Sequence, residues 1–164
     1  MRAQAAGLTQ AQKTVLAEYL GERPIRHNTV SKLLFCNGNS NDIHREQSET
    51  EIKSWGMSPE NRRSVSADVA GLSKSDIEQL DLKWAFAYPN AKQARSQPIV
   101  SKGEIFVGSH DGTIYSLDLN TGCANWTFKA DSEVRHALSL GRWKDDNSEA
   151  LFFGDLAGNV YAIN

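Results

Sequence analysis

A 15-residue pattern occurs twice in the chain, and this repetition constrains the fold more than any other feature. Residues 104–118 read EIFVGSHDGTIYSLD, and residues 150–164 read ALFFGDLAGNVYAIN. Two glycines and a tyrosine recur at a constant offset, because 154 − 108, 158 − 112 and 161 − 115 all equal 46. A W-x-F triplet also recurs, at Trp84 and Trp126 (126 − 84 = 42). Repeat periods of 40 to 50 residues with several strands each indicate β-propeller blades.

Each copy of the pattern predicts a β-hairpin. Short runs of β-branched, aromatic and other apolar residues flank the four-residue turns SHDG (109–112) and DLAG (155–158). A β-meander in a sandwich would share these features, but the repeated register and the tryptophan that follows the first copy favour a propeller. The two offsets differ by 4, and we assign this difference to a longer polar loop within residues 141–150.

The N-terminal segment predicts an amphipathic helix within residues 8–24. Thr9 is the candidate N-cap, and Gln12 three residues later completes a capping box. Gly21 is expected to end the helix. The apolar face consists of Ala11, Val15, Leu16, Tyr19 and Leu20. A helix this short is not stable alone, so it must pack against another surface.

The segment between this helix and the repeats is expected to be mostly linker. Residues 24–53 are polar and rich in turn-forming types. Ser73 with Asp76 gives a second capping signal, after which Ile77 and Leu80 are expected to face inward. A strand is expected to start near Leu82.

Composition excludes several classes of protein. The 164 residues carry a formal net charge of −2, and the pI of about 6.1 does not favour binding to nucleic acid or to an anionic membrane. No apolar run approaches the 18 residues of a membrane span, and the first 25 residues lack the apolar core of a signal peptide. The two cysteines, Cys36 and Cys123, form no C-x-x-C and no cysteine–histidine cluster with metal-ligand spacing.

Residues 116–126, SLDLNTGCANW, resemble the tryptophan-docking motif of quinoprotein dehydrogenases, A-x-D-x-x-T-G-x-x-x-W. Four positions match, and Ser116 replaces the usual alanine. The matching residues are Asp118, Thr121, Gly122 and Trp126. In that family the tryptophan packs between neighbouring blades, and the glycine lets it approach the backbone. An aromatic ring with a polar N–H suits such a seam.

The resemblance extends along nearly the whole chain. Residues 55–63 and 82–86 resemble the start of the propeller in these enzymes. Residues 95–100 and 121–123 resemble the subgroup of polyvinyl-alcohol dehydrogenases that carry a cytochrome domain, and the N-terminal helix resembles the last helix of a class I c-type cytochrome. The resemblance implies a mainly β fold: a partial propeller of about two blades with PQQ-type repeats, preceded by an α-helix.

The same resemblance implies three parts and a fragment of a longer enzyme. Residues 1–24 would end a truncated cytochrome c-like domain, residues 25–70 would form the linker and the start of the propeller, and residues 71–164 would be an incomplete propeller. The haem-attachment motif C-x-x-C-H does not occur. We therefore expect the chain on its own to be catalytically silent.

The chemistry implied by the resemblance is alcohol oxidation in the periplasm. Pyrroloquinoline quinone (PQQ) would accept electrons from the alcohol with the help of Ca²⁺ and pass them to haem c of a cytochrome c-type acceptor. Because PQQ has three carboxylates, guanidinium groups suit its pocket. Arg95 and Arg135 each follow a W-x-F by about ten residues (95 − 84 = 11; 135 − 126 = 9), at the expected start of an inner strand. Each could also be a surface residue of an inter-blade loop.

No carboxylate lies in a motif that identifies the catalytic base or the Ca²⁺ ligands, so these stay unassigned. Because the family is exported, Cys36 and Cys123 are expected to pair if the linker folds back on the first blade. The alternative function is a non-catalytic propeller of PQQ-type repeats that acts as a protein-interaction scaffold.

Overall fold

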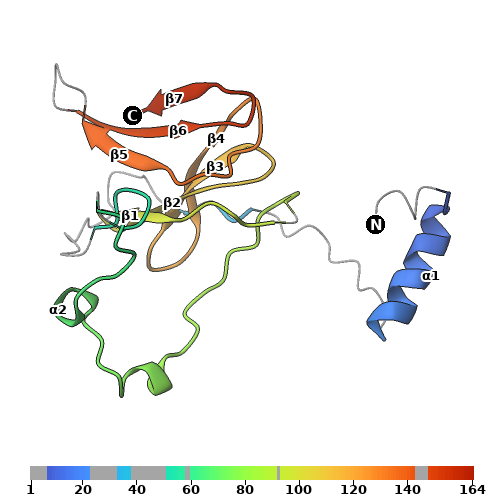
Figure 1. Cartoon of the computed structure of the whole chain (residues 1–164), viewed down its shortest axis with the longest axis horizontal. Helices are drawn as coiled ribbons and strands as arrows, with labels where there is room; N and C mark the ends of the chain where they lie inside the picture. The colour runs from blue at the N-terminus through green and yellow to red at the C-terminus, as the bar shows by residue number, and fades with distance from the viewer. Residues whose placement is uncertain (1–6, 23–32, 38–50, 58–59, 92, 143–147) are drawn as a thin grey trace. The chain divides into compact units, whose positions relative to one another are not determined.

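The computed structural model describes residues 7–22, 33–37, 51–57, 60–91, 93–142 and 148–164 (Figure 1). The chain divides into two units, Met1–Ser31 and Lys32–Asn164. The first contains helix α1 (Gln10–Gly21). In the second, the described residues form α2 (Ala67–Ala70), the 3₁₀ helix η1 (Ile77–Gln79) and the strands β1 (Ile99–Ser101), β2 (Glu104–Gly108), β3 (Thr113–Asp118), β4 (Ala124–Lys129), β5 (Ser139–Arg142), β6 (Glu149–Gly154) and β7 (Val160–Ile163).

The strands form two consecutive antiparallel meanders. The first sheet has the order β1-β2-β3-β4 and the second has the order β5-β6-β7. Each strand therefore pairs with its neighbour in the sequence, which is the strand order of a propeller blade. The expectation of a mainly β fold with a partial propeller of about two blades is confirmed.

The two hairpins have the same register, as the repeat predicts. Gly108 pairs with Ile114 in the first, and Gly154 pairs with Val160 in the second, 46 residues later. Gly112 and Gly158 adopt φ of 84° and 90°, so both turns need a glycine.

The hydrogen bonds of the two turns also match. The N–H of Gly112 donates to the carbonyl of Ser109 at 3.0 Å, and the N–H of Gly158 donates to that of Asp155 at 3.2 Å. The Ser109 hydroxyl accepts from the N–H of Asp111, and the Asp155 carboxylate accepts from that of Ala157.

The two sheets share one apolar core. Phe128 of β4 contacts Phe153 and Tyr161 of the second sheet edge-to-face, at centroid distances of 6.0 and 5.8 Å. Ile114 and Leu138 are fully buried in this cluster, and burial of one such side chain contributes about 2 kcal/mol. Figure 1 shows the second sheet, in orange and red, lying against the first. Packing through facing apolar side chains is how adjacent blades adhere.

A segment from the linker lies along the outer strand of the first sheet. Phe35 forms a parallel bridge with Ala124 of β4. The N–H of Cys36 donates to the carbonyl of Ala124 at 3.0 Å, and the N–H of Ala124 donates to that of Leu34 at 2.8 Å. A disulfide joins Cys36 and Cys123, with their Cα atoms 5.1 Å apart. The expected pairing of the two cysteines is confirmed.

Helix α1 begins as the sequence predicts. The Thr9 hydroxyl accepts from the N–H of Gln12, and the Gln12 side chain accepts from the N–H of Thr9, which completes the capping box. The helix also ends at Gly21 as predicted, although the residue that adopts the left-handed cap conformation is Glu22. Within the unit that contains α1, the predicted apolar face is exposed, at 79% for Tyr19 and 72% for Leu20.

The prediction for residues 71–84 is wrong in two respects. Ile77 and Leu80 do not face inward, since they are 60% and 61% exposed. No strand starts near Leu82, which is 85% exposed. The Asp76 carboxylate accepts from both the N–H and the hydroxyl of Ser73, so the capping residues close a turn and only a 3₁₀ segment follows. Residues 143–147, within the predicted polar loop, lie outside the described part of the chain.

Candidate functional site

The glycine of the docking motif lies directly under a tryptophan ring. A Cβ atom added to Gly122 would lie 2.6 Å from Cδ2 of Trp84. The indole N–H of Trp84 donates to the carbonyl of Leu119 at 3.0 Å. The Asp118 carboxylate accepts from the N–H and the hydroxyl of Thr121, at 2.7 and 2.6 Å, and so holds the turn that presents the glycine. The tryptophan that docks on this turn therefore comes from the preceding W-x-F.

Trp126, the tryptophan of the motif itself, lies one repeat further on. It is half-buried, and its ring is 5.8 Å from that of Phe106. It lines a cavity of about 250 Å³ together with Leu140 of β5 and Asn164. Trp126 thus lies between the first sheet and the second, as Trp84 lies against the first.

Arg95 and Arg135 occupy equivalent positions in the two sheets. Each lies four residues before the first strand of its sheet (99 − 95 = 4; 139 − 135 = 4). The two loops are also joined. The Ser96 hydroxyl donates to the carbonyl of His136 at 2.9 Å and accepts from the N–H of Gly108 at 3.3 Å. The structure therefore brings together the loops that carry the two arginines, at one end of the sheets.

Arg135 forms an ion pair that the sequence analysis did not identify. Its Nε donates to Oε2 of Glu133 at 2.7 Å, and its Nη2 contacts the same oxygen. Nδ1 of His110 lies 3.9 Å from that oxygen, and Nε2 of His110 is buried without a hydrogen-bond partner among the described residues. The spacing of Glu133, two positions before Arg135, could have indicated this ion pair. Nothing in the sequence indicated that His110 lies next to Glu133.

The backbone of this loop is fixed by the hairpin turns of both sheets. The N–H of Val134 donates to the carbonyl of Ser109, and the N–H of Leu156 donates to the carbonyl of Glu133, each at 3.0 Å. Val134 is fully buried. The loop is therefore anchored from both sides, and Arg135, which is half-buried, extends from a fixed backbone.

The turn of the second hairpin contains a carboxylate with several donors. Burial opposes ionisation of Asp155, but hydrogen bonds from Asn159, the Tyr161 hydroxyl and the N–H of Ala157 hold its pKa below the usual value. The distances are 3.0, 2.9 and 2.9 Å. The Tyr161 hydroxyl also accepts from the N–H of Asp131 at 3.1 Å. The carboxylate thus connects the turn to the loop that carries Arg135.

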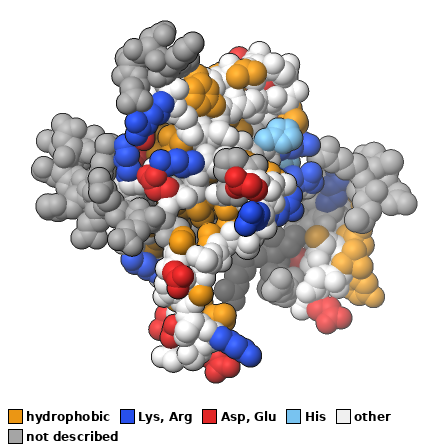
Figure 2. Space-filling model, turned by 60° about the vertical axis from the view of Figure 1, so that its left-hand side comes forward, with side chains coloured by type: hydrophobic (Ala, Val, Ile, Leu, Met, Phe, Trp, Pro, Cys, Tyr) orange, Lys and Arg blue, Asp and Glu red, His pale blue; other side chains and the backbone are white. Residues whose placement is uncertain are grey.

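Neither a metal cluster nor a membrane span is present in the described ranges. No group of three or more histidine, cysteine, aspartate or glutamate residues there could hold a metal ion. No helix in these ranges is long and apolar enough to cross a bilayer. Acidic and basic side chains are interspersed on the face shown in Figure 2.

The chain has named relatives, although no protein-family model matches it. It is 30% identical to a polyvinylalcohol dehydrogenase of Pseudomonas sp over 182 aligned positions. This alignment covers 100% of this chain and 28% of that protein. It is 30% identical to a polyvinylalcohol dehydrogenase of Sphingopyxis sp. (strain 113P3), over 67% of this chain and 16% of that protein. A quinoprotein ethanol dehydrogenase of Pseudomonas aeruginosa is 26% identical over 75% of this chain and 20% of that protein.

A solved structure of a europium-containing methanol dehydrogenase is also similar, with a TM-score of 0.36 and 24% identity, over 38% of this chain and 11% of that one. The curated relatives are several times longer than the region that this chain matches. The resemblance deduced from the docking motif is confirmed: the chain is related to part of the PQQ-dependent quinoprotein alcohol dehydrogenases. Within this group, two of the relatives are polyvinylalcohol dehydrogenases.

Proposed function

We propose that the chain provides two propeller blades of a periplasmic quinoprotein that oxidises alcohols, with secondary alcohols or polyvinyl alcohol as substrates. The observation that carries this proposal is the 30% identity to a polyvinylalcohol dehydrogenase across the whole chain. The two meander sheets and the tryptophan docked on Gly122 support it, because they supply the architecture that such an enzyme requires.

Arg135 and Arg95 fit a group with several carboxylates. The ion pair with Glu133 occupies Nε and Nη2 of Arg135, and Nη1 is not part of it. Glu133 therefore orients the guanidinium of Arg135, and the N–H groups on Nη1 stay outside this ion pair. Arg95 is exposed, and its loop is joined to that of Arg135 by the hydrogen bond between Ser96 and His136. When bound, PQQ supplies the two-electron acceptor for the alcohol, with Ca²⁺ polarising the quinone.

The proposal includes a c-type cytochrome as the electron acceptor and the periplasm as the compartment. Helix α1 would be the last helix of a cytochrome c-like domain, and electrons would pass to haem c of a c-type cytochrome. The disulfide between Cys36 and Cys123 supports an oxidising compartment such as the periplasm, because disulfides are rare where thiols are kept reduced.

PQQ affinity tests the roles of the two arginines. The protein for this test is a hybrid in which the chain replaces the matched segment of the Pseudomonas sp enzyme. We expect Arg135→Ala and Arg95→Ala each to weaken PQQ binding at least tenfold, since each removes a charge-assisted contact with a carboxylate. Arg62→Ala, at an exposed position outside these loops, is the matched control. Unchanged PQQ affinity in both loop variants would show that neither arginine binds the cofactor.

A further inference from the structure

A short segment before the repeats lies between the first strands of the two sheets. Ile52 and Val100 of β1 exchange two backbone hydrogen bonds, each 2.8 Å long. On the other side, the N–H of Leu140 of β5 donates to the carbonyl of Lys53 at 2.9 Å. One extended segment therefore occupies two strand edges at once. These edges would otherwise present unpaired N–H and C=O groups.

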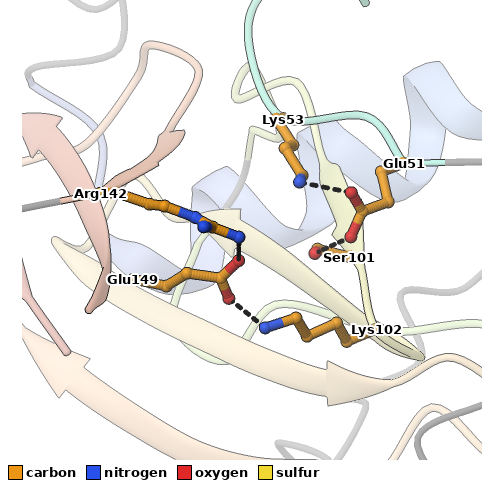
Figure 3. Close-up of polar contacts among 6 residues, drawn as sticks. All are labelled: Glu51, Lys53, Ser101, Lys102, Arg142 and Glu149. Atoms are coloured by element: carbon orange, nitrogen blue, oxygen red, sulfur yellow. Dashed lines mark hydrogen bonds and ion pairs between the residues drawn. The ribbon is translucent and has the colours of Figure 1, made fainter. Parts of the chain in front are cut away.

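Side-chain contacts also join this segment to the first sheet, and the first sheet to the second. Glu51 pairs with Lys53 and accepts from the Ser101 hydroxyl at 2.7 Å, and these two contacts, in that order, lower the pKa of its carboxyl. Nearby, the Glu149 carboxylate contacts Lys102 of the β1–β2 turn and lies 3.9 Å from Arg142 of β5. Figure 3 shows both groups of contacts. The second group joins the two sheets directly.

Gln97 holds the other end of the segment. Its side-chain oxygen accepts from the N–H of Gly56, and its amide nitrogen donates to the carbonyl of Ser54, each at 3.1 Å. Gly56 is buried with φ of 75°, and an added Cβ would lie 2.8 Å from Cα of Asn61. The turn at residues 54–57 is thus closely fitted. Gln97 lies two positions after Arg95, in the loop joined to that of Arg135.

We infer that residues 51–56 fasten the two sheets together, with residues 51–53 as an extended segment shared by both sheet edges and the turn that follows as its anchor, and we call residues 51–56 the clip. The edges of β1 and β5 converge on the clip, whereas the opposite edge of the first sheet, at β4, carries residues 34–36. Radial sheets converge at the axis of a propeller, so the clip occupies the inner edges. It fixes the loops of Arg95 and Arg135 relative to each other. This inference does not depend on the proposed enzymatic activity.

Hydrogen exchange of three backbone amides reports on the clip. These amides belong to Ile52, Val100 and Leu140, and each is a donor in the contacts described above. The measurement uses the full chain and two variants. Ile52→Pro removes one of the donors. Gln97→Ala removes the two hydrogen bonds to the turn at residues 54–57 without changing either strand edge. It tests the inference even if the proline variant does not fold.

In Gln97→Ala we expect all three amides to exchange at least tenfold faster while the amides within β3 keep their protection. Gln79→Ala, the matched control in the exposed η1, should leave all three unchanged. Wild-type protection of the three amides in Gln97→Ala would overturn the inference. Faster exchange at Ile52 and Val100 with unchanged exchange at Leu140 would overturn it as well, because the segment would then serve only the first sheet.

Discussion

The ring of Trp84 packs on Gly122, 38 positions later in the chain, so closely that no side chain fits between them. A Cβ atom at Gly122 would lie 2.6 Å from two ring atoms, and the indole N–H binds the carbonyl of Leu119 in the same turn. The contact joins the segment before the first sheet to the turn between β3 and β4. It gives the glycine of the docking motif a steric role in addition to its positive φ of 72°.

Gly122→Ala should destabilise the fold more than a glycine replacement without a docked ring. A positive φ alone costs about 1 kcal/mol for alanine, and displacement of the indole adds roughly 1–3 kcal/mol. Gly158→Ala is the matched control, since its φ is 90° and nothing lies within 4 Å of an added Cβ. Urea unfolding followed by tryptophan fluorescence measures both. Equal losses in the two variants would show that the contact with Trp84 does not stabilise the fold.

Reduction of the disulfide should destabilise the second unit strongly. Cys36 and Cys123 are 87 positions apart, and a loop of this size contributes about 4–5 kcal/mol through the unfolded state. Residues 34–36 should also lose their pairing with Ala124. The measurement is urea unfolding with and without dithiothreitol.

A double variant is the control for this prediction. Cys36→Ser with Cys123→Ser should match the reduced protein and should not respond to dithiothreitol. An unfolding midpoint of the wild type that does not change on reduction would contradict the stabilising role of the disulfide.

Asp155 should make stability depend on pH in the acid range. Because hydrogen bonds to its carboxylate lower its folded-state pKa, the stabilisation is fully present above the unfolded value of about 3.9. It is lost as the pH falls through the lower folded value. Asp155→Asn should therefore reduce the urea midpoint at pH 7, and the difference from wild type should shrink below pH 4.

The control for the acid-range prediction is Asp68→Asn, at an exposed aspartate in α2. It should leave the midpoint almost unchanged at both pH values. A difference between wild type and Asp155→Asn that stays constant from pH 7 to pH 2 would exclude a role for ionised Asp155 in stability.

The parts of the fold that repeat were predictable from the sequence. Two copies of one hairpin pattern are expected to pair in the same register, so the pairing of Gly108 with Ile114 implied that of Gly154 with Val160. The disulfide followed from the number of cysteines and from the resemblance. In both cases the residues that determine the feature, the repeated glycines and the single pair of cysteines, can be recognised in the sequence.

Other features depend on surfaces that the sequence does not identify. The apolar spacing of Ile77 and Leu80 is compatible with a buried face, but nothing in the described part of the chain covers them, and they are exposed. The clip pairs Ile52 with Val100 across 48 positions (100 − 52 = 48), and its three extended residues, 51–53, are too few to carry a periodic signal in the sequence. Likewise, the sequence placed Arg135 at the start of an inner strand but did not reveal its ion pair with Glu133.

Alcohol oxidation by the chain alone and by a hybrid enzyme tests the central claim most directly. The hybrid is the Pseudomonas sp polyvinylalcohol dehydrogenase in which this chain replaces the matched segment, and both proteins receive PQQ, Ca²⁺, polyvinyl alcohol and an artificial dye. We expect dye reduction by the hybrid and none by the chain above a blank with free PQQ, because two blades cannot enclose the cofactor at the centre of a propeller. A hybrid that folds and binds PQQ but does not oxidise the alcohol, or turnover by the chain alone, would contradict the account.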